Sequence, residues 1–216
     1  MTPLKDRVLC QKILETARAL SPQGLGIGRS GNVSARIGSG MLITPSGVAY
    51  DDMQPEDIIF VDGDGIAETH SLLPSSEWQL HLAIYQSRPE ASAIVHCHSR
   101  FATVLACAHM PIPAFHYMVA VAGGTDIRCA SYALFGSEEL SRHVLVGLEG
   151  RKACLMANHG QVAFGADLAS AFELALEVED LAAQYCALVK LGKVNLLSEA
   201  EMGAVLARFK TYGRQG

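Results

Sequence analysis

Two histidines lie two positions apart in the sequence, and this pair is the first feature that could do chemistry. His96 and His98 flank Cys97 at the end of a short apolar run, 93–97. Alternate side chains of a strand point to the same face, so both imidazoles would project together while Cys97 faces the other way. Such a pair can occupy two tetrahedral positions of a zinc ion. The spacing indicates a candidate metal site, although H-x-H pairs also occur on ordinary polar surfaces.

His159 is the third histidine that could join this pair. It lies in Asn158-His159-Gly160, between two apolar runs, 153–157 and 161–164, that we predict to be strands. If these strands lie beside 93–97, His159 would complete a three-histidine site with room left for a substrate. The remaining histidines show no such grouping, and for each we expect a surface position or a hydrogen-bonded core position: His70, His81, His109, His116 and His143.

Glu77 lies at the predicted start of a helix, directly after Ser75 and Ser76. The pattern from Ser76 to Gln79 is typical of a capping box, in which two side chains satisfy each other's free backbone amides. We expect this carboxylate outside the core and close to the electropositive end of the helix. There it could act as a base, or it could simply complement the helix dipole.

Three short polar segments could bind an anion. A helix N-terminus with serine hydroxyls, here Ser75 and Ser76, suits a phosphate because the free amides and the dipole both favour negative charge. Ser30-Gly31-Asn32 and Ser46-Gly47 offer two further loops whose backbone amides could approach the same anion. Each loop alone is more often a turn than a phosphate site, so their meaning depends on whether they meet in space.

These residues must be positioned by a mixed set of strands and helices. Hydrophobic patterns and turn residues predict strands over 32–37, 41–44, 58–61, 93–97, 118–122, 153–157 and 161–164. Cap signals predict helices over 3–20 with Thr2 as the cap, from Ser76 towards Pro89, over 101–108, over 137–148, from Asp167 to 191, and from Ser198. The chain has no strict strand-helix-strand repeat and no G-x-G-x-x-G after a first strand, which disfavours a dinucleotide-binding fold. We therefore expect one α/β domain spanning 1–216.

The composition excludes several classes of protein. The chain has 216 residues, a formal net charge of −5 and 50% hydrophobic residues, which fits a folded globular protein. No run of lysine and arginine could follow a nucleic-acid backbone, so we expect no such partner. No stretch approaches the ~20 apolar residues of a membrane span, and the charged N-terminus lacks a signal-peptide core. We expect a cytoplasmic protein whose six dispersed cysteines are reduced.

Five motifs follow one another along the chain: Ser30-Gly31-Asn32-Val33-Ser34, Thr44-Pro45-Ser46-Gly47, Pro74-Ser75-Ser76-Glu77, His96-Cys97-His98 and Asn158-His159-Gly160. In their order and approximate spacing, they resemble the class II aldolase/adducin family over nearly the whole chain. Within the family, the resemblance is strongest to the branch that cleaves L-fuculose 1-phosphate. It extends there to Gln86-Ser87-Arg88-Pro89, His116-Tyr117-Met118, Gly123-Gly124 and the tail 209–213.

The resemblance implies a three-layer αβα fold around a largely antiparallel central sheet, and a C4 homotetramer with active sites at subunit interfaces. It implies that His96, His98 and His159 hold zinc, with Glu77 as a further ligand until substrate displaces it. Manganese, cobalt or iron could take the same ligands. Phosphate binding is assigned to Gly31, Asn32, Ser46, Gly47, Ser75 and Ser76. Tyr117, with Tyr212 as a second candidate, would reach the site of a neighbouring subunit.

The implied reaction is the retro-aldol cleavage of a ketose 1-phosphate. With L-fuculose 1-phosphate, the products would be dihydroxyacetone phosphate and L-lactaldehyde. Zinc would act as a Lewis acid on the oxygens where negative charge develops, so no Schiff-base lysine is needed. Glu77 would give a proton to the enediolate carbon, or take it in the synthetic direction, which requires a pKa raised towards neutrality. Tyr117 would handle the proton of the aldehyde oxygen.

Other enzymes with this fold remain open on the sequence alone: a 5-deoxyribulose-phosphate aldolase, a ribulose-phosphate 4-epimerase, a methylthioribulose-phosphate dehydratase and a four-carbon acid-phosphate decarboxylase. The epimerase pattern has Asp where this chain has Glu77, which favours the aldolase. A non-catalytic scaffold like the adducin head would be expected to lack the three histidines. A generic zinc hydrolase would explain the histidines but would leave the polar loops without a role.

Overall fold

A mixed sheet is the centre of the structure, a computed structural model that describes residues 6–211. Over these residues the sheet has seven strands in the order β3-β2-β1-β4-β7-β6-β5. The strands are β1 (Asn32–Ile37), β2 (Gly40–Ile43), β3 (Ile59–Val61), β4 (Ala93–Cys97), β5 (Cys129–Ala130), β6 (Ala153–Met156) and β7 (Gly160–Gly165). Every neighbouring pair is antiparallel except β5 and β6, so the predicted largely antiparallel sheet is confirmed.

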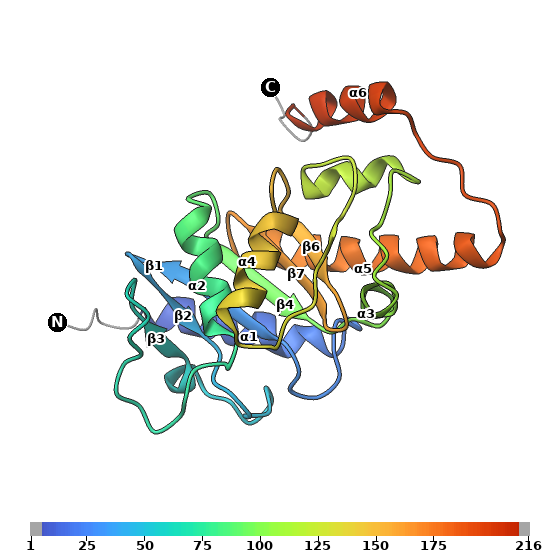
Figure 1. Cartoon of the computed structure of the whole chain (residues 1–216). Helices are drawn as coiled ribbons and strands as arrows, with labels where there is room; N and C mark the ends of the chain where they lie inside the picture. The colour runs from blue at the N-terminus through green and yellow to red at the C-terminus, as the bar shows by residue number, and fades with distance from the viewer. Residues whose placement is uncertain (1–5, 212–216) are drawn as a thin grey trace.

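Helices cover both faces of this sheet (Figure 1). The described α-helices are α1 (Arg7–Leu20), α2 (Trp78–Ser87), α3 (Arg100–Cys107), α4 (Glu138–Gly147), α5 (Leu168–Lys190) and α6 (Glu199–Phe209), and the 3-10 helices are η1 (Pro55–Asp57) and η2 (Tyr117–Ala122). Helices α2 and α4 pack together over one face, whereas α1, α3 and α5 cover the other. The predicted three-layer αβα fold is therefore confirmed.

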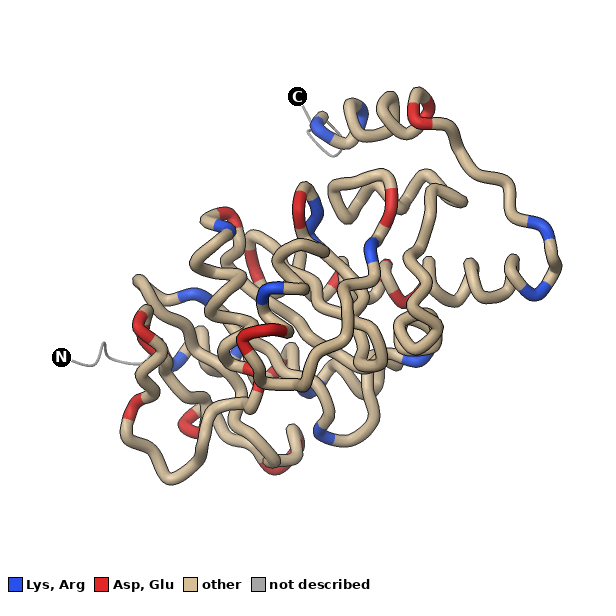
Figure 2. Tube along the Cα trace, viewed as in Figure 1, with Lys and Arg blue, Asp and Glu red and all other residues tan. Residues whose placement is uncertain are grey.

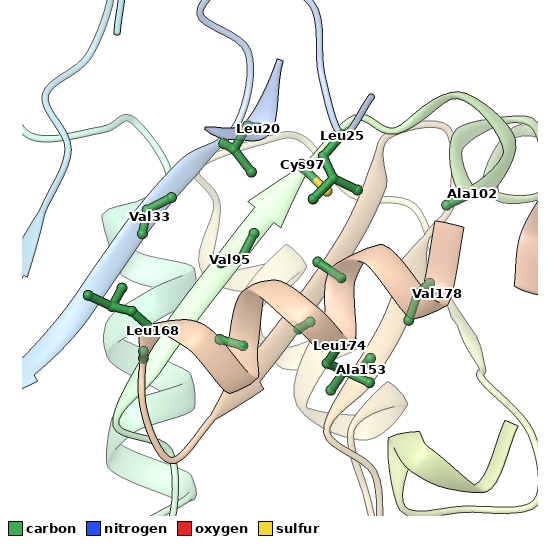
Figure 3. Packing of buried hydrophobic residues seen from close by; sticks show 14 of the residues in the cluster. Leu20, Leu25, Val33, Val95, Cys97, Ala102, Ala153, Leu168, Leu174 and Val178 are labelled. Carbon is green, nitrogen blue, oxygen red and sulfur yellow. The ribbon is translucent and has the colours of Figure 1, made fainter. Parts of the chain in front are cut away.

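Two hydrophobic clusters fill the spaces between the layers. Val95 and Cys97 of β4 share one cluster with Leu174 of α5 (Figure 3). Ile94 of the same strand belongs to the other cluster, under α2 and α4. The alternation of β4 therefore directs Cys97 into the core beneath α5 and His96 to the opposite face, as the spacing predicted.

Several predicted elements agree closely with the structure. The strand over 93–97 coincides with β4. Asp167 is the cap of α5, and its side chain accepts a hydrogen bond from the backbone amide of Ser170 at 2.7 Å. Ser198 forms the predicted capping box with Glu201 at the start of α6. Local cap chemistry was therefore a reliable guide to these helix starts.

The first helix begins later than predicted. Helix α1 starts at Arg7, because the Asp6 side chain accepts hydrogen bonds from the free amides of the first turn. The predicted cap Thr2 lies outside the described residues.

The predicted strand over 118–122 is wrong. These residues belong to the 3-10 helix η2, whose first turn is capped by a hydrogen bond from Met118 N to His116 Nδ1 at 3.2 Å. The turn is closed by Gly123, which has a positive φ of 97°. A short apolar run cannot by itself distinguish a buried strand from a buried helical turn.

The predicted capping box at Ser76 is also wrong. Helix α2 begins at Trp78 with Glu77 in the cap position, and no side chain accepts a capping hydrogen bond there. The Glu77 side chain points to partners elsewhere in the fold, described below.

Charged residues of both signs are mixed along the described chain (Figure 2). Among residues 6–211, no helix is both long and apolar enough to cross a bilayer. The buried polar side chains, by contrast, include a group near the C-terminal end of β4: Asn32, Ser75, Glu77, His81, His96 and Ser99. These buried polar side chains make the C-terminal end of β4 the candidate location of a functional site.

Candidate metal centre

Three histidines converge at the C-terminal end of β4. His96 belongs to that strand, His98 follows it, and His159 lies in the turn between β6 and β7. Because β4 and β7 are paired, with Cys97 opposite Gln161, the turn is brought beside the end of β4. The ring centroids of the three imidazoles are 4.8 to 4.9 Å apart. The proximity predicted from strand adjacency is found.

Glu77 brings a carboxylate to the same point from the α2 layer. Its Oε2 lies 2.9 Å from His96 Nε2, and its Oε1 lies 3.2 Å from His159 Nε2. Together with His98, these residues offer four ligand atoms within 4.8 Å of one another. Glu77 is only 6% exposed, so the expectation that it lies outside the core is wrong. The histidines and a nearby amide supply the polar partners that a buried carboxylate needs.

The donor set fits a metal ion. His96 Nδ1 is 2.8 Å from the carbonyl oxygen of Gln161, so we assign the ring proton to Nδ1 and the lone pair to Nε2. That Nε2 lies 3.0 Å from His98 Nε2. Two imidazole nitrogens at this distance require a proton or a cation between them. Glu77 Oε1 is buried and accepts no hydrogen bond from the described residues. Three imidazole nitrogens and one carboxylate are ligands that zinc accepts.

The pKa values of these groups favour metal binding. Burial and the neighbouring His96 lower the pKa of His98 to about 4. The same two causes lower the pKa of His159 to about 4, so both rings are neutral at physiological pH. Burial opposes the ionisation of Glu77, but His96, His159 and Asn32 outweigh it and hold its pKa well below the usual value. The predicted rise of this pKa towards neutrality is therefore wrong, because the neighbouring His96 and the Asn32 amide stabilise the ionised carboxylate.

A cleft of about 360 Å³ opens beside these ligands. Glu77, His98 and His159 line it. The same cleft is lined by the six residues proposed from the sequence for phosphate, Gly31, Asn32, Ser46, Gly47, Ser75 and Ser76. Two of the loops are tied to each other, since Ser46 N donates to Leu73 O and Ser75 N donates to Thr44 O. The three polar loops and the candidate metal ligands therefore meet in one place.

Gly31 is required by the close approach of its loop to the backbone of β4. Its φ is 97°, in the left-handed region, and a Cβ added here would lie 2.7 Å from the carbonyl oxygen of His96. Only glycine combines this φ with so close an approach of two backbones. The Ser30-Gly31-Asn32 loop can thus lie close beside the strand that carries His96.

The sequence and the fold match known proteins. A family model described as the Class II Aldolase and Adducin N-terminal domain matches residues 11–186. The chain belongs to the class II aldolase and adducin family. Class II aldolases are metal-dependent, and within residues 6–211 the group Glu77, His96, His98 and His159 could bind a metal ion.

Relatives within the class II aldolase family match almost the whole chain. A 5-methylthioribulose-1-phosphate/5-deoxyribulose-1-phosphate aldolase of Rhodospirillum rubrum is 51% identical over 201 residues, which cover 93% of this chain and 90% of that protein. The L-fuculose phosphate aldolase of Escherichia coli K12 is 46% identical over 206 residues, which cover 95% of each protein. A solved L-fuculose 1-phosphate aldolase superposes with a TM-score of 0.93 at 38% identity, over 97% of this chain and 100% of that one. The prediction of an aldolase-type enzyme is confirmed.

Three residues of the cleft in this class II aldolase were missed by sequence reasoning: Arg29, Tyr132 and Phe135. Arg29 is the one lysine or arginine among the described residues that line the cleft, and its Nη1 donates to Gly47 O at 2.6 Å. Its position next to Ser30-Gly31-Asn32 was the available signal. Tyr132 and Phe135 are 57% and 60% exposed although both are large aromatic residues. Nothing in their local sequence pattern indicated that they line this cleft.

The turn that carries His159 is held by an unusual pair of residues. Asn158 and His109 both have a φ of 55°, and they are the non-glycine residues with positive φ in the described part of the chain. His109 Nε2 lies 2.6 Å from Asn158 Oδ1. Asparagine and histidine tolerate this conformation better than most residues, and the hydrogen bond links the turn to the loop after α3.

Tyr117 does not line the cleft of its own chain. It lies in η2, is 51% exposed, and has its ring centroid 4.8 Å from that of His116. A role at the site would therefore require the cleft of another subunit. Tyr212, the second candidate for such a role, lies outside the described residues.

Proposed function

We propose that this protein is a zinc-dependent aldolase that cleaves a ketose 1-phosphate to dihydroxyacetone phosphate and a small aldehyde. The proposal rests on the meeting of two sites in one cleft: a Glu/His group that suits a metal ion, and three polar loops that suit a phosphate. In a ketose 1-phosphate, the phosphorylated carbon is bonded directly to the carbonyl carbon. Such a molecule could therefore reach both sites at once.

His96, His98 and His159 would hold the metal ion, with Glu77 as a fourth ligand before substrate binds. Bound there, zinc would supply Lewis acidity at the substrate's carbonyl oxygen and adjacent hydroxyl oxygen, on which negative charge develops. The hydrogen bond from His96 Nδ1 to the Gln161 carbonyl fixes the orientation of that ring. Manganese, cobalt or iron suit the same donor atoms.

Glu77 would move the proton at carbon 3. As an ionised carboxylate, it can take this proton from dihydroxyacetone phosphate in the synthetic direction and return it to the enediolate in cleavage. Its burial keeps bulk water away from this transfer. Tyr117 would exchange the proton of the aldehyde oxygen, and we propose that it does so in the cleft of a neighbouring subunit of a C4 homotetramer.

The phosphate would be bound by backbone amides and hydroxyls of the three loops. Gly31, Ser46, Gly47, Ser75 and Ser76 lie in these loops around the cleft. The side chain of Asn32 is already hydrogen-bonded to Glu77. Arg29 would add a positive charge to an otherwise neutral set of donors.

L-fuculose 1-phosphate is the first candidate substrate, and cleavage between carbons 3 and 4 would release L-lactaldehyde. The second candidate is 5-deoxyribulose 1-phosphate or its 5-methylthio analogue, which would release acetaldehyde or its methylthio derivative. The 51% identity to the Rhodospirillum rubrum aldolase favours this second candidate. These substrates share the phosphorylated half and differ in the aldehyde half. Tyr132 and Phe135 are the large side chains of the cleft available to contact that half.

A coupled assay for released dihydroxyacetone phosphate tests this proposal. The panel contains L-fuculose 1-phosphate, 5-deoxyribulose 1-phosphate and 5-methylthioribulose 1-phosphate, with L-ribulose 5-phosphate as the probe for an epimerase. Release of dihydroxyacetone phosphate from at least one ketose 1-phosphate is expected, and the highest kcat/KM identifies the aldehyde. Conversion of L-ribulose 5-phosphate to its epimer, with no release from the other three, would refute the aldolase.

A further inference from the structure

A chain of hydrogen bonds runs through the protein interior and ends on Glu77. Tyr85 Oη lies 2.8 Å from Ser34 Oγ, and Ser34 Oγ lies 2.6 Å from His81 Nδ1. On the other side of the ring, His81 Nε2 lies 2.5 Å from Asn32 Oδ1. The Asn32 amide then donates from Nδ2 to Glu77 Oε2 at 3.1 Å. The five side chains come from β1, from α2 and from the cap of α2.

Each of these hydrogen-bonded side chains is shielded from solvent. Ser34 and His81 are completely buried, and Tyr85 and Asn32 are exposed by 2% and 4%. A histidine in the core, between a strand and a helix, is costly unless both ring nitrogens are satisfied. Here both are satisfied, by a serine on one side and an asparagine on the other. Burial lowers the pKa of His81 to about 3, so the ring is neutral.

The direction of every hydrogen bond follows from the carboxylate at the end. An ionised carboxylate can only accept, so Asn32 presents Nδ2 to Glu77 and Oδ1 to His81. His81 must then carry its proton on Nε2, which leaves Nδ1 to accept from the hydroxyl of Ser34. The oxygen of Ser34 in turn accepts from Tyr85. All donors therefore point towards Glu77, and no member can be reversed without losing a bond.

The two oxygens of Glu77 differ in the same arrangement. Oε2 accepts the Asn32 hydrogen bond and faces His96. Oε1 lies 3.2 Å from His159 Nε2 and is buried without a hydrogen bond from any described residue. A proton added to Oε2 would oppose the amide donor already there, whereas a proton added to Oε1 leaves the chain of bonds intact.

We propose that His81 is a positioning residue, which acts through Asn32 to anchor Oε2 of Glu77 and leaves Oε1 as the oxygen that exchanges the proton with substrate. The inference rests on the proposed aldolase function, since it concerns the orientation of its base. His81 itself contacts neither the substrate cleft nor a metal ligand; it holds Asn32. Displacement of a reacting group by about 1 Å can cost about 100-fold in rate, so an anchor of this kind is worth a measurable factor in kcat.

Two substitutions of His81 test the contacts of its two ring nitrogens separately. In His81→Gln, the amide nitrogen takes the place of Nε2 and can still donate to Asn32. In His81→Asn, the shorter amide takes the place of Nδ1 and can contact Ser34 but not Asn32. Both side chains are neutral amides, so each variant is the matched control for the other.

The expected result is a difference in kcat between the two variants. His81→Asn should lose about 10- to 100-fold in kcat for dihydroxyacetone phosphate release, with KM and bound zinc within about twofold of wild type. His81→Gln should keep kcat within about threefold of wild type. Equal losses of kcat in both variants would overturn the positioning role. A change confined to KM or to bound zinc would overturn it as well. Wild-type protein that releases no dihydroxyacetone phosphate in this assay would refute the proposed function instead.

Ser34→Ala removes a single oxygen on the other side of His81 from Asn32, beside His81 Nδ1. It therefore tests the inference even if His81→Asn does not fold. Without the serine, Nδ1 of His81 loses its donor, so the ring that holds Asn32 is anchored on one side only. We expect kcat to fall about 10-fold while KM stays within about twofold. A kcat equal to that of wild type would contradict the positioning role of His81.

Discussion

Glu77 Oε2 lies 2.9 Å from Nε2 of His96, although the two residues belong to different layers of the fold. His96 is fixed in the central strand β4, and Glu77 is the cap residue of α2. The Glu77 carboxylate points towards the sheet and does not cap helix α2. The contact joins a candidate metal ligand to a candidate base within one buried group.

Glu77→Gln tests the role of the carboxylate. The amide keeps the shape and one oxygen of the side chain but cannot exchange a proton. We expect kcat for dihydroxyacetone phosphate release to fall by at least about 100-fold, while bound zinc per chain stays at the wild-type level. An active Glu77→Gln enzyme would exclude Glu77 as the base.

His159→Ala tests the metal centre. His159 is partly exposed in a turn, so its removal should leave the core intact while taking away one of three nitrogen ligands. We expect bound zinc, measured by elemental analysis of purified protein, to fall to background, and the same loss in His96→Ala. His143→Ala is the control, because His143 contacts Ser131 O and is not part of the ligand group. Wild-type zinc content in His159→Ala would contradict the assignment.

Arg29→Gln tests the positive charge at the phosphate loops. Loss of a charged donor at an exposed position should raise KM for the ketose 1-phosphate about 10-fold, equivalent to about 1.4 kcal/mol, and leave kcat nearly unchanged. Arg142→Gln, an exposed arginine that does not line this cleft, serves as the control. If both variants have the wild-type KM, Arg29 does not contact the phosphate.

Ser76→Asp tests the same subsite by repulsion. A carboxylate in this loop should repel the phosphate and raise KM more than Ser76→Ala, which removes only one hydroxyl. The comparison separates lost hydrogen bonding from added charge. Equal KM values for the two variants would count against phosphate binding at this loop.

Gly31→Ala tests the close approach of the Ser30-Gly31-Asn32 loop to β4. The added Cβ would require an unfavourable φ and would lie 2.7 Å from the carbonyl oxygen of His96. We expect the free energy of unfolding, measured by urea denaturation, to fall by about 2–4 kcal/mol. Gly28→Ala is the matched control, since Gly28 also has a positive φ, 67°, but open space around its Cβ position. A loss no larger than that of the control would show that the backbone approach is relaxed in solution.

The proximity of the three histidines could be predicted from strand alternation and strand adjacency, whereas their assignment to zinc came from the family resemblance. Alternation along a strand placed His96 and His98 on one face, and the pairing of β4 with β7 brought His159 to them. The three-layer fold followed from the family resemblance in the five motifs. Cap residues such as Asp167 and Ser198 fixed the helix starts, because their hydrogen bonds span only a few residues.

The features that were missed depend on contacts between distant segments. The burial of Glu77 and the low pKa that follows are set by His96, His159 and Asn32, which lie on other elements. His81 was expected only to be a surface or hydrogen-bonded core residue, and its partner Ser34 lies on β1, far away in the sequence. The η2 turn was mistaken for a strand because its apolar run carries no period long enough to identify a helix.

The most direct test of the account is the release of dihydroxyacetone phosphate by the wild-type protein before chelation, after chelation, and after zinc is added back. We predict cleavage of a ketose 1-phosphate that is lost when the metal is removed and returns with zinc. Cleavage that persists in protein shown by elemental analysis to be free of metal would contradict the assignment of the three histidines and Glu77 to a catalytic metal centre.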